Sequence, residues 1–177
     1  GEVWRVDYRQ THKGMQFRVR NTTKADIAKV IRLEQSPQNA PYIDQWSEQQ
    51  HTTALNDLNI AHWVLETVTT ESPALLGYVI LVGLQDSDNA LHFRRIVIAE
   101  KRAGLGRATV QYIKDFAFHQ NRSHRLWLNV KEGNNAAHAL YLSEGFVEEG
   151  LARDAAKVGE GKYASHIVMS MLEGEHL

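Results

Sequence analysis

The chain has 177 residues, of which 43% are hydrophobic and 23% charged, with a formal net charge of −1 at pH 7. These values are those of one ordinary globular domain, and they exclude a disordered tail, a collagen-like rod and a low-complexity scaffold. The absence of cysteine excludes a disulfide framework, a cysteine nucleophile and a thiolate metal site, and it fits a reducing compartment.

Alternation of apolar and polar residues predicts strands, and apolar residues at helical spacing predict helices. In chain order these patterns predict a strand at 17–20, a helix at 24–34, strands at 61–68, 74–84 and 91–99, a helix at 105–120, a strand at 125–130, a helix at 135–143 and a strand at 166–172. Residues 35–59 predict either a loop or a second, less regular helix. Residues 1–14 receive no element and form an N-terminal extension of unknown role, so we expect a single mixed α/β domain over 15–177.

The longest nearly unbroken apolar run, residues 74–84, is too short to cross a bilayer. The first residues have neither the basic start nor the apolar core of a secretory signal. We therefore expect a cytoplasmic protein without a membrane segment.

Charged residues are unevenly divided along the chain. Residues 33–93 contain eight acids and neither lysine nor arginine, whereas residues 94–131 contain nine basic residues and two acids. Blocks of like charge this long usually create a local potential that selects a partner. The alternative is that the two blocks lie on faces whose charges cancel across the fold.

A turn with two glycines, Gly104 and Gly106, joins the strand at 91–99 to the helix at 105–120. Glycine lets the backbone approach a ligand closely, and the free N–H groups of the first helical turn attract anions. Basic side chains flank the turn, so we expect it to bind a phosphate-bearing ligand. The turn lacks the Gly-Lys-Ser/Thr of a P-loop and the third glycine of a dinucleotide fingerprint. A plain strand-to-helix turn is the alternative.

The turn is the first of two motifs that follow each other in a fixed order. The first has the sequence Lys101-Arg102-Ala103-Gly104-Leu105-Gly106, and the second is made of Asn134, Ala137, Leu140-Tyr141 and Gly145-Phe146. Together they resemble the GNAT superfamily of acetyl-CoA-dependent N-acetyltransferases, with lysine where the family usually has glutamine or arginine. The likeness covers residues 17–172. The tail at 149–154 and 161–163 is typical of the branch that acetylates ribosomal-protein N-termini and spermidine.

This resemblance implies a fold of α+β type, with a central mixed, mostly antiparallel sheet of six to seven strands flanked by helices. It also implies a strand-turn-helix cradle for acetyl-CoA, in which strand backbone pairs with the pantetheine amides and the glycine turn holds the pyrophosphate. The implied cofactor-binding residues are Ile96, Val97, Ile98, Lys101, Arg102, Ala103, Gly104, Leu105, Gly106, Arg107, Asn134, Ala137 and Tyr141.

Acetyl transfer to an amine requires a neutral amine and a stabilised thiolate. The resemblance places the phenol of Tyr141 near the thioester sulfur, where its O–H would protonate or hydrogen-bond the leaving thiolate. The alternative is that Tyr141 is core packing beside Phe146. Candidates for the base are His92, on the strand before the cradle, Glu66 on an adjacent strand, and water. Histidine has an ordinary pKa of about 6.5, which suits a base at neutral pH.

The resemblance makes residues 24–59 one wall of the acceptor cleft, and this wall lies mostly in the segment without lysine or arginine. An acidic wall attracts a cationic amine, and aromatic rings add cation–π contacts to it. The acceptor-binding residues that we predict are Glu34, Tyr42 and Trp46.

These observations predict an N-acetyltransferase that acts on a cationic small molecule or on a peptide or protein N-terminus. Its alternative is a non-catalytic sensor or regulatory module that binds acyl-CoA. The glycine turn already explains the basic residues around it, so we expect no nucleic-acid partner, and we leave a homodimer open. The nine histidines include neither His-x-x-x-His nor His-Glu-x-x-His, so we expect no metal.

Overall fold

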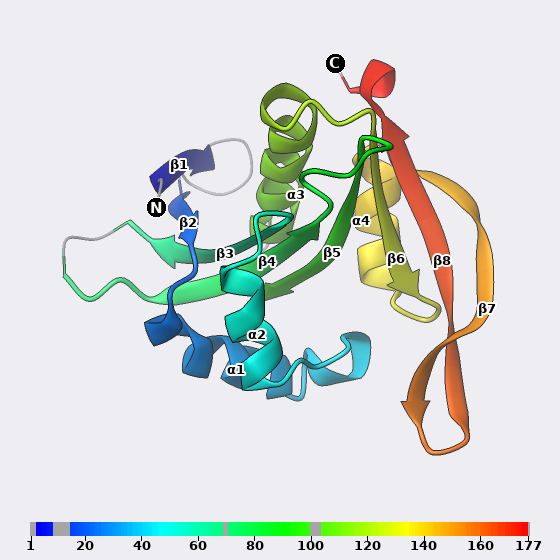
Figure 1. Ribbon diagram of the computed structural model, residues 1–177, viewed down its shortest axis with the longest axis horizontal. Helices are drawn as coiled ribbons and strands as arrows, with labels where there is room; N and C mark the ends of the chain where they lie inside the picture. The colour runs from blue at the N-terminus through cyan, green and yellow to red at the C-terminus, as the bar shows by residue number, and fades with distance from the viewer. Residues whose placement is uncertain (1–2, 9–14, 69–70, 100–103, 177) are drawn as a thin grey trace.

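The computed structural model describes residues 3–8, 15–68, 71–99 and 104–176. Within these residues eight strands form one sheet in the order β1-β2-β3-β4-β5-β6-β8-β7 (Figure 1). Only β5 and β6 pair in parallel, and every other neighbouring pair of described strands is antiparallel. The strands are β1 (Val3–Tyr8), β2 (Met15–Asn21), β3 (Ile60–Thr67), β4 (Leu75–Val82), β5 (Ala90–Ile98), β6 (Arg125–Lys131), β7 (Val147–Gly159) and β8 (Lys162–Leu172).

Four α-helices flank the sheet in the described part of the chain: α1 (Ile27–Gln35), α2 (Glu48–Leu55), α3 (Leu105–Asp115) and α4 (Asn135–Ser143). A 3-10 turn, Lys24–Asp26, leads into α1, and a π-helical segment, Phe116–Gln120, continues α3. The helix predicted at 105–120 therefore changes its winding near its end.

The two faces of the sheet are covered by different helices. On β4, Val79 and Leu81 pack in the core that contains α3 and α4, whereas Tyr78 and Ile80 pack on the opposite face with Val30 of α1. Successive strand residues point to opposite faces, so a strand covered on both sides is apolar throughout. This is why residues 74–84 form a nearly unbroken apolar run.

The structure confirms the predicted fold class, a mixed, mostly antiparallel sheet flanked by helices. Strands β2 to β8 supply seven strands, and β1, from the segment left unassigned, adds an eighth at the edge. Residues 35–59 do contain a second helix, α2.

Strand β7 is the element that the sequence patterns missed. Almost all of its residues are exposed, so they show no alternation of buried and exposed positions. It pairs with β8 across three register shifts, and the two strands form a long twisted hairpin that extends beyond the rest of the sheet (Figure 1).

Candidate active site

A cleft of about 1190 Å³ opens where β5 and β6 separate. The two strands pair only through Ala90, Leu91 and His92 with Arg125, Leu126 and Trp127. Beyond this point each keeps its other neighbour, β4 or β8, so the two edges that face each other carry unpaired backbone groups. Such an edge accepts the amides of an extended ligand as an added strand. Ile96, Val97 and Ile98, which are predicted to bind the cofactor, all line this cleft.

The glycine turn forms one end of the cleft. Gly104 has a φ of +90° and directly precedes α3, whose first turn presents free N–H groups. Gly104, Gly106 and Arg107 line the cleft, whereas Leu105 is buried in the core and does not. The predicted ligands Lys101, Arg102 and Ala103 lie outside the described residues.

Arg107 is held at the cleft by two contacts from the end of α4. One guanidinium nitrogen lies 2.6 Å from the carboxylate of Glu144 and 2.9 Å from the hydroxyl of Ser143. The side chain remains partly exposed, at 37%.

The second motif supplies the other wall. Asn134 caps α4, accepting a hydrogen bond from the backbone N–H of Ala137 at 3.4 Å, and both residues line the cleft. The asparagine therefore fixes the start of α4 in addition to facing the ligand space.

Tyr141 lines the cleft from α4 with its ring buried. The ring packs edge-on against Phe93 and Phe146, with centroids 5.8 and 5.7 Å away. Among the described residues its hydroxyl has no hydrogen-bond partner, and burial raises the pKa of the phenol. The ring of Tyr141 is therefore part of the core, and the role of its hydroxyl stays a prediction.

His92 also lines the cleft, at the point where β5 and β6 part. Burial, with a smaller effect of the Arg94 charge, lowers the pKa of His92 to about 4. The imidazole is therefore neutral at pH 7 but only weakly basic, which removes the pKa argument for it as a base.

Glu66 is not placed to act as a base, and this prediction is wrong. Its carboxylate lies 3.2 Å from a guanidinium nitrogen of Arg20 and 3.6 Å from one of Arg18, both on the neighbouring strand β2. It does not line the cleft.

Glu34 was predicted to bind the acceptor, and the structure contradicts this too. It is fully buried and accepts hydrogen bonds from Tyr78 at 2.6 Å and Arg95 at 3.0 Å, while its Oε1 lies 2.6 Å from Nε2 of His51. Burial opposes ionisation, but the hydrogen bonds from His51 and Tyr78 outweigh it and lower the pKa of Glu34. Glu34 is the centre of a buried polar network.

Of the two aromatic residues predicted to bind the acceptor, only one lines the cleft. Tyr42 is exposed and lines the cleft, but Trp46 does not, because its ring faces Arg94 and Arg95, whose guanidinium carbons lie 5.9 and 5.3 Å from the ring centroid. Trp46 therefore receives its cation–π contacts from the protein itself.

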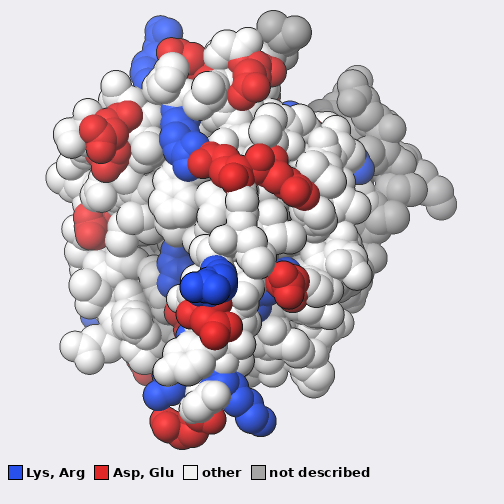
Figure 2. Space-filling model, turned by 90° about the vertical axis from the view of Figure 1, so that its right-hand side faces the viewer, with Lys and Arg blue, Asp and Glu red and all other residues white. Residues whose placement is uncertain are grey.

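Two acids of the predicted acidic wall are paired with arginines from across the fold. Arg94 lies 3.4 Å from Asp44, and Arg95 is paired with Glu34. These two pairs join the acidic block of the sequence to the basic block, so the charges of the two blocks cancel in part. Figure 2 shows positive and negative side chains interspersed over the side of the molecule that carries β7 and β8.

Sequence reasoning missed many of the cleft residues, among them the charged or titratable Arg94, Lys131 and His166. A β-bulge explains Arg94, because Ile80 pairs with Arg95 and Leu81 with Phe93, leaving Arg94 as the extra residue. A bulge re-aims a side chain. The Arg94-Arg95 doublet, which interrupts an alternating strand, was the available sequence signal.

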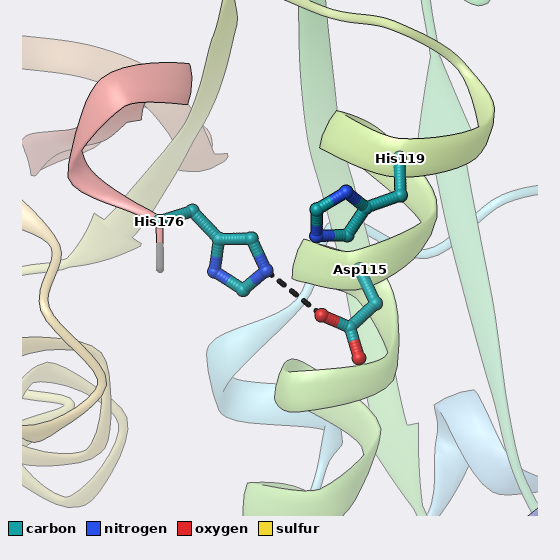
Figure 3. A group of neighbouring side chains, drawn as sticks. All are labelled: Asp115, His119 and His176. Carbon is teal, nitrogen blue, oxygen red and sulfur yellow. Dashed lines mark hydrogen bonds and ion pairs between the residues drawn. The ribbon is translucent and has the colours of Figure 1, made fainter.

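One group of described side chains, Asp115, His119 and His176, has the residue types and spacing that could hold a metal ion (Figure 3). Their ligand atoms lie within 4.8 Å of one another, and His176 Nε2 is 2.8 Å from Asp115 Oδ1. None of the three lines the cleft. His176 comes from the far end of the chain, which is why no local spacing pointed to the group.

No helix in the described part of the chain combines the length and the apolar character needed to cross a bilayer.

The family comparison agrees with the geometry. The sequence model of the Acetyltransferase (GNAT) family matches residues 27–146, more than half of the chain. The fold is shared with the crystal structure of spermidine N-acetyltransferase from Vibrio cholerae in complex with CoA and spermine, at a TM-score of 0.76 and 23% identity, covering 90% of this chain and 96% of that one. A chimera of the Vibrio cholerae enzyme SpeG and hSSAT gives a TM-score of 0.77 at 23% identity, covering 89% and 96%. The chain therefore belongs to the GNAT family of acetyltransferases.

Proposed function

We propose that this chain transfers an acetyl group from acetyl-CoA to a primary amine by direct attack, with Tyr141 as the general acid. The observation that carries the proposal is the placement of Tyr141, which lines the cleft between the separated strands β5 and β6 and whose hydroxyl has no hydrogen-bond partner among the described residues.

The cleft suits acetyl-CoA at both ends. The unpaired edges of β5 and β6 offer N–H and C=O groups to the amides of the pantetheine arm, and Gly104 with the start of α3 suits a pyrophosphate. Acetyl-CoA, when bound, supplies the thioester whose acetyl group is transferred.

Tyr141 then acts on the leaving group. As the amine nitrogen bonds to the carbonyl carbon and the C–S bond breaks, Tyr141 donates its proton to the sulfur. It regains a proton from the amine through solvent in the cleft, so the proton count balances. Burial holds the proton on the phenol until the thiolate forms beside it.

His92 has a lesser part in this scheme. Because its pKa is lowered to about 4, it can accept a hydrogen bond from the amine but holds a proton poorly at neutral pH. We assign removal of the amine proton mainly to water.

The sequence predicts a cationic acceptor, and a structural neighbour is the spermidine N-acetyltransferase from Vibrio cholerae in complex with CoA and spermine. The pairing of Glu34 and Asp44 with arginines removes part of the negative charge on which this prediction rested. We therefore leave the acceptor as a primary amine here and derive its charge separately below.

A homodimer is a further part of the proposal. Val147, Leu151 and Val158 of the edge strand β7 are each about half exposed, and an edge strand with apolar side chains is a surface for pairing with another chain. Light scattering on the purified protein measures the oligomeric state directly.

The function is tested by following free thiol release from acetyl-CoA with a panel of alkylamines, polyamines, amino acids and peptides. We expect release with at least one primary amine. Calorimetry that shows acetyl-CoA binding without thiol release for any amine would identify the chain as a sensor instead of an enzyme.

A further inference from the structure

Three of the cleft's groups that carry or accept positive charge come from the neighbouring strands β5, β6 and β8. Arg94 projects from the bulge in β5, Lys131 ends β6, and His166 lies directly opposite Lys131 in the register of β6 with β8. All three line the cleft.

The electrostatics of the cleft agree with this placement. Burial lowers the pKa of His166, and the charges of Lys131 and Arg94 lower it further. The Arg94 charge also contributes to the lowered pKa of His92. Arg94 and Lys131 therefore bring positive charge to this part of the cleft.

Little negative charge compensates it. The ammonium of Lys131 contacts the backbone carbonyl of Pro41 at 3.4 Å and forms no ion pair with a described carboxylate. Asp44 is the one acid among the described residues that line the cleft; it lies 3.4 Å from Arg94, and its side chain is 71% exposed. An exposed pair at this distance stabilises weakly and leaves Arg94 able to exchange partners.

The phosphates of the donor do not account for these cations. The cradle for a pyrophosphate is at Gly104 and Arg107, after the end of β5, and Arg94 precedes Ile98 by about 13 Å of strand. Lys131 is tied to the loop after α1 by Pro41, not to α3.

We infer that the amine acceptor also carries an anionic group, a carboxylate or a phosphate, and that Arg94, Lys131 and His166 bind this group. The inference rests on the proposed function and sets the substrate class of the same cleft. A polyamine would instead bring further positive charge to these residues.

Matched pairs of amines test the inference. β-Alanine is compared with propylamine, and O-phosphoethanolamine with ethanolamine, with spermidine as the polycation. We expect kcat/KM for the anionic member of at least one pair to exceed that of its neutral partner and of spermidine by about tenfold or more, the worth of one charge-assisted hydrogen bond. The pair that shows the preference identifies carboxylate or phosphate.

Variants locate the binding group. Lys131→Gln should lower kcat/KM for the preferred anionic amine by about tenfold and leave the neutral amine and the KM for acetyl-CoA within about threefold. Lys131→Glu should reverse the preference within the pair. Lys162→Gln, an exposed lysine at the start of β8 that does not line the cleft, is the matched control and should change neither value.

Three outcomes would overturn the inference. A preference of the unmodified protein for spermidine or for the neutral amines shows that no anion is recognised. A rise in the KM for acetyl-CoA in Lys131→Gln, with the amine preference unchanged, assigns the cations to the donor. In these two cases acetyl transfer still takes place, so the proposed function stands. The third outcome is that no amine causes thiol release from acetyl-CoA, which would contradict both the inference and the proposed function.

Discussion

The imidazole of His92 lies flat against the indole of Trp127, with ring centroids 3.8 Å apart and planes at 3°. The two residues are also paired across β5 and β6, at the last position before the strands separate. His92 is thus fixed at the closed end of the cleft by both its backbone and its ring.

This placement predicts a modest effect of removing His92. In His92→Gln we expect kcat/KM to fall by less than about tenfold, because a weakly basic imidazole contributes little as a general base. In the unmodified protein the rise of kcat/KM with pH should follow the pKa of the acceptor amine and shift when the amine is changed. A rise centred near pH 6.5 for every amine, abolished in His92→Gln, would restore His92 as the base.

Tyr141→Phe should have a much larger effect. The variant keeps the ring contacts with Phe93 and Phe146 and loses only the hydroxyl. We expect kcat to fall by about 10²- to 10⁴-fold, as for the loss of a general acid, with the affinity for acetyl-CoA unchanged by calorimetry. Turnover close to that of the unmodified protein would leave Tyr141 as core packing.

Gly104→Val should abolish acetyl-CoA binding. A β-branched residue at a φ of +90° is strained, and its side chain would occupy the approach to the start of α3. Gly161→Val is the control, since Gly161 has a φ of +66° in the β7–β8 turn and open space around it. Both variants should lose some stability in urea, but only Gly104→Val should lose the calorimetric signal for acetyl-CoA. Equal affinity in the two folded variants would remove the turn from the site.

Acid should destabilise the fold through His62. The ring is buried, with its nitrogens 2.7 Å from the Thr22 hydroxyl and 2.9 Å from Nδ1 of His51. Burial, reinforced by the charge of His51, lowers the pKa of His62 to about 3. The unfolded chain therefore binds this proton more readily, so the stability contributed by neutral His62 is complete above pH 6.5 and is lost as the pH falls from there toward 3.

The loss attributable to His62 should be about 2 kcal/mol of unfolding free energy between pH 7 and pH 5. We expect the unfolding free energy of His62→Gln, measured in urea, to fall between pH 7 and pH 5 by about 2 kcal/mol less than that of the unmodified protein. The exposed His119→Gln is the control and should behave as the unmodified protein does. The same pH dependence in His62→Gln and in the unmodified protein would contradict the assignment.

Metal chelation should leave turnover unchanged. Asp115, His119 and His176 do not line the cleft, and the chemistry proposed for Tyr141 needs no Lewis acid. We expect equal kcat/KM before and after dialysis against EDTA, and in His119→Ala. A loss of activity that is restored by adding a divalent metal would contradict this prediction.

The sequence was sufficient for the features that depend on local pattern. The apolar run of β4, the alternation on β5, the glycine before α3 and the asparagine that caps α4 are each visible within a few residues of sequence. These local patterns predicted the fold class and pointed to residues that line one part of the cleft, Gly104, Gly106 and Asn134 among them.

Features that depend on long-range pairing could not be predicted in this way. The acids of residues 33–93 look unpaired locally, yet Arg95 reaches Glu34 and Arg94 reaches Asp44 only after the strands assemble. Strand β7 is held by backbone pairing with β8 while its side chains stay exposed, so no hydrophobic period marks it.

The short parallel junction between β5 and β6 also divides the domain. Five strands lie on one side of it and three on the other, and only three residue pairs join them within the sheet. A ligand that forms hydrogen bonds with both free edges would connect the two parts of the sheet. Binding in the cleft would then also stiffen the domain across this junction.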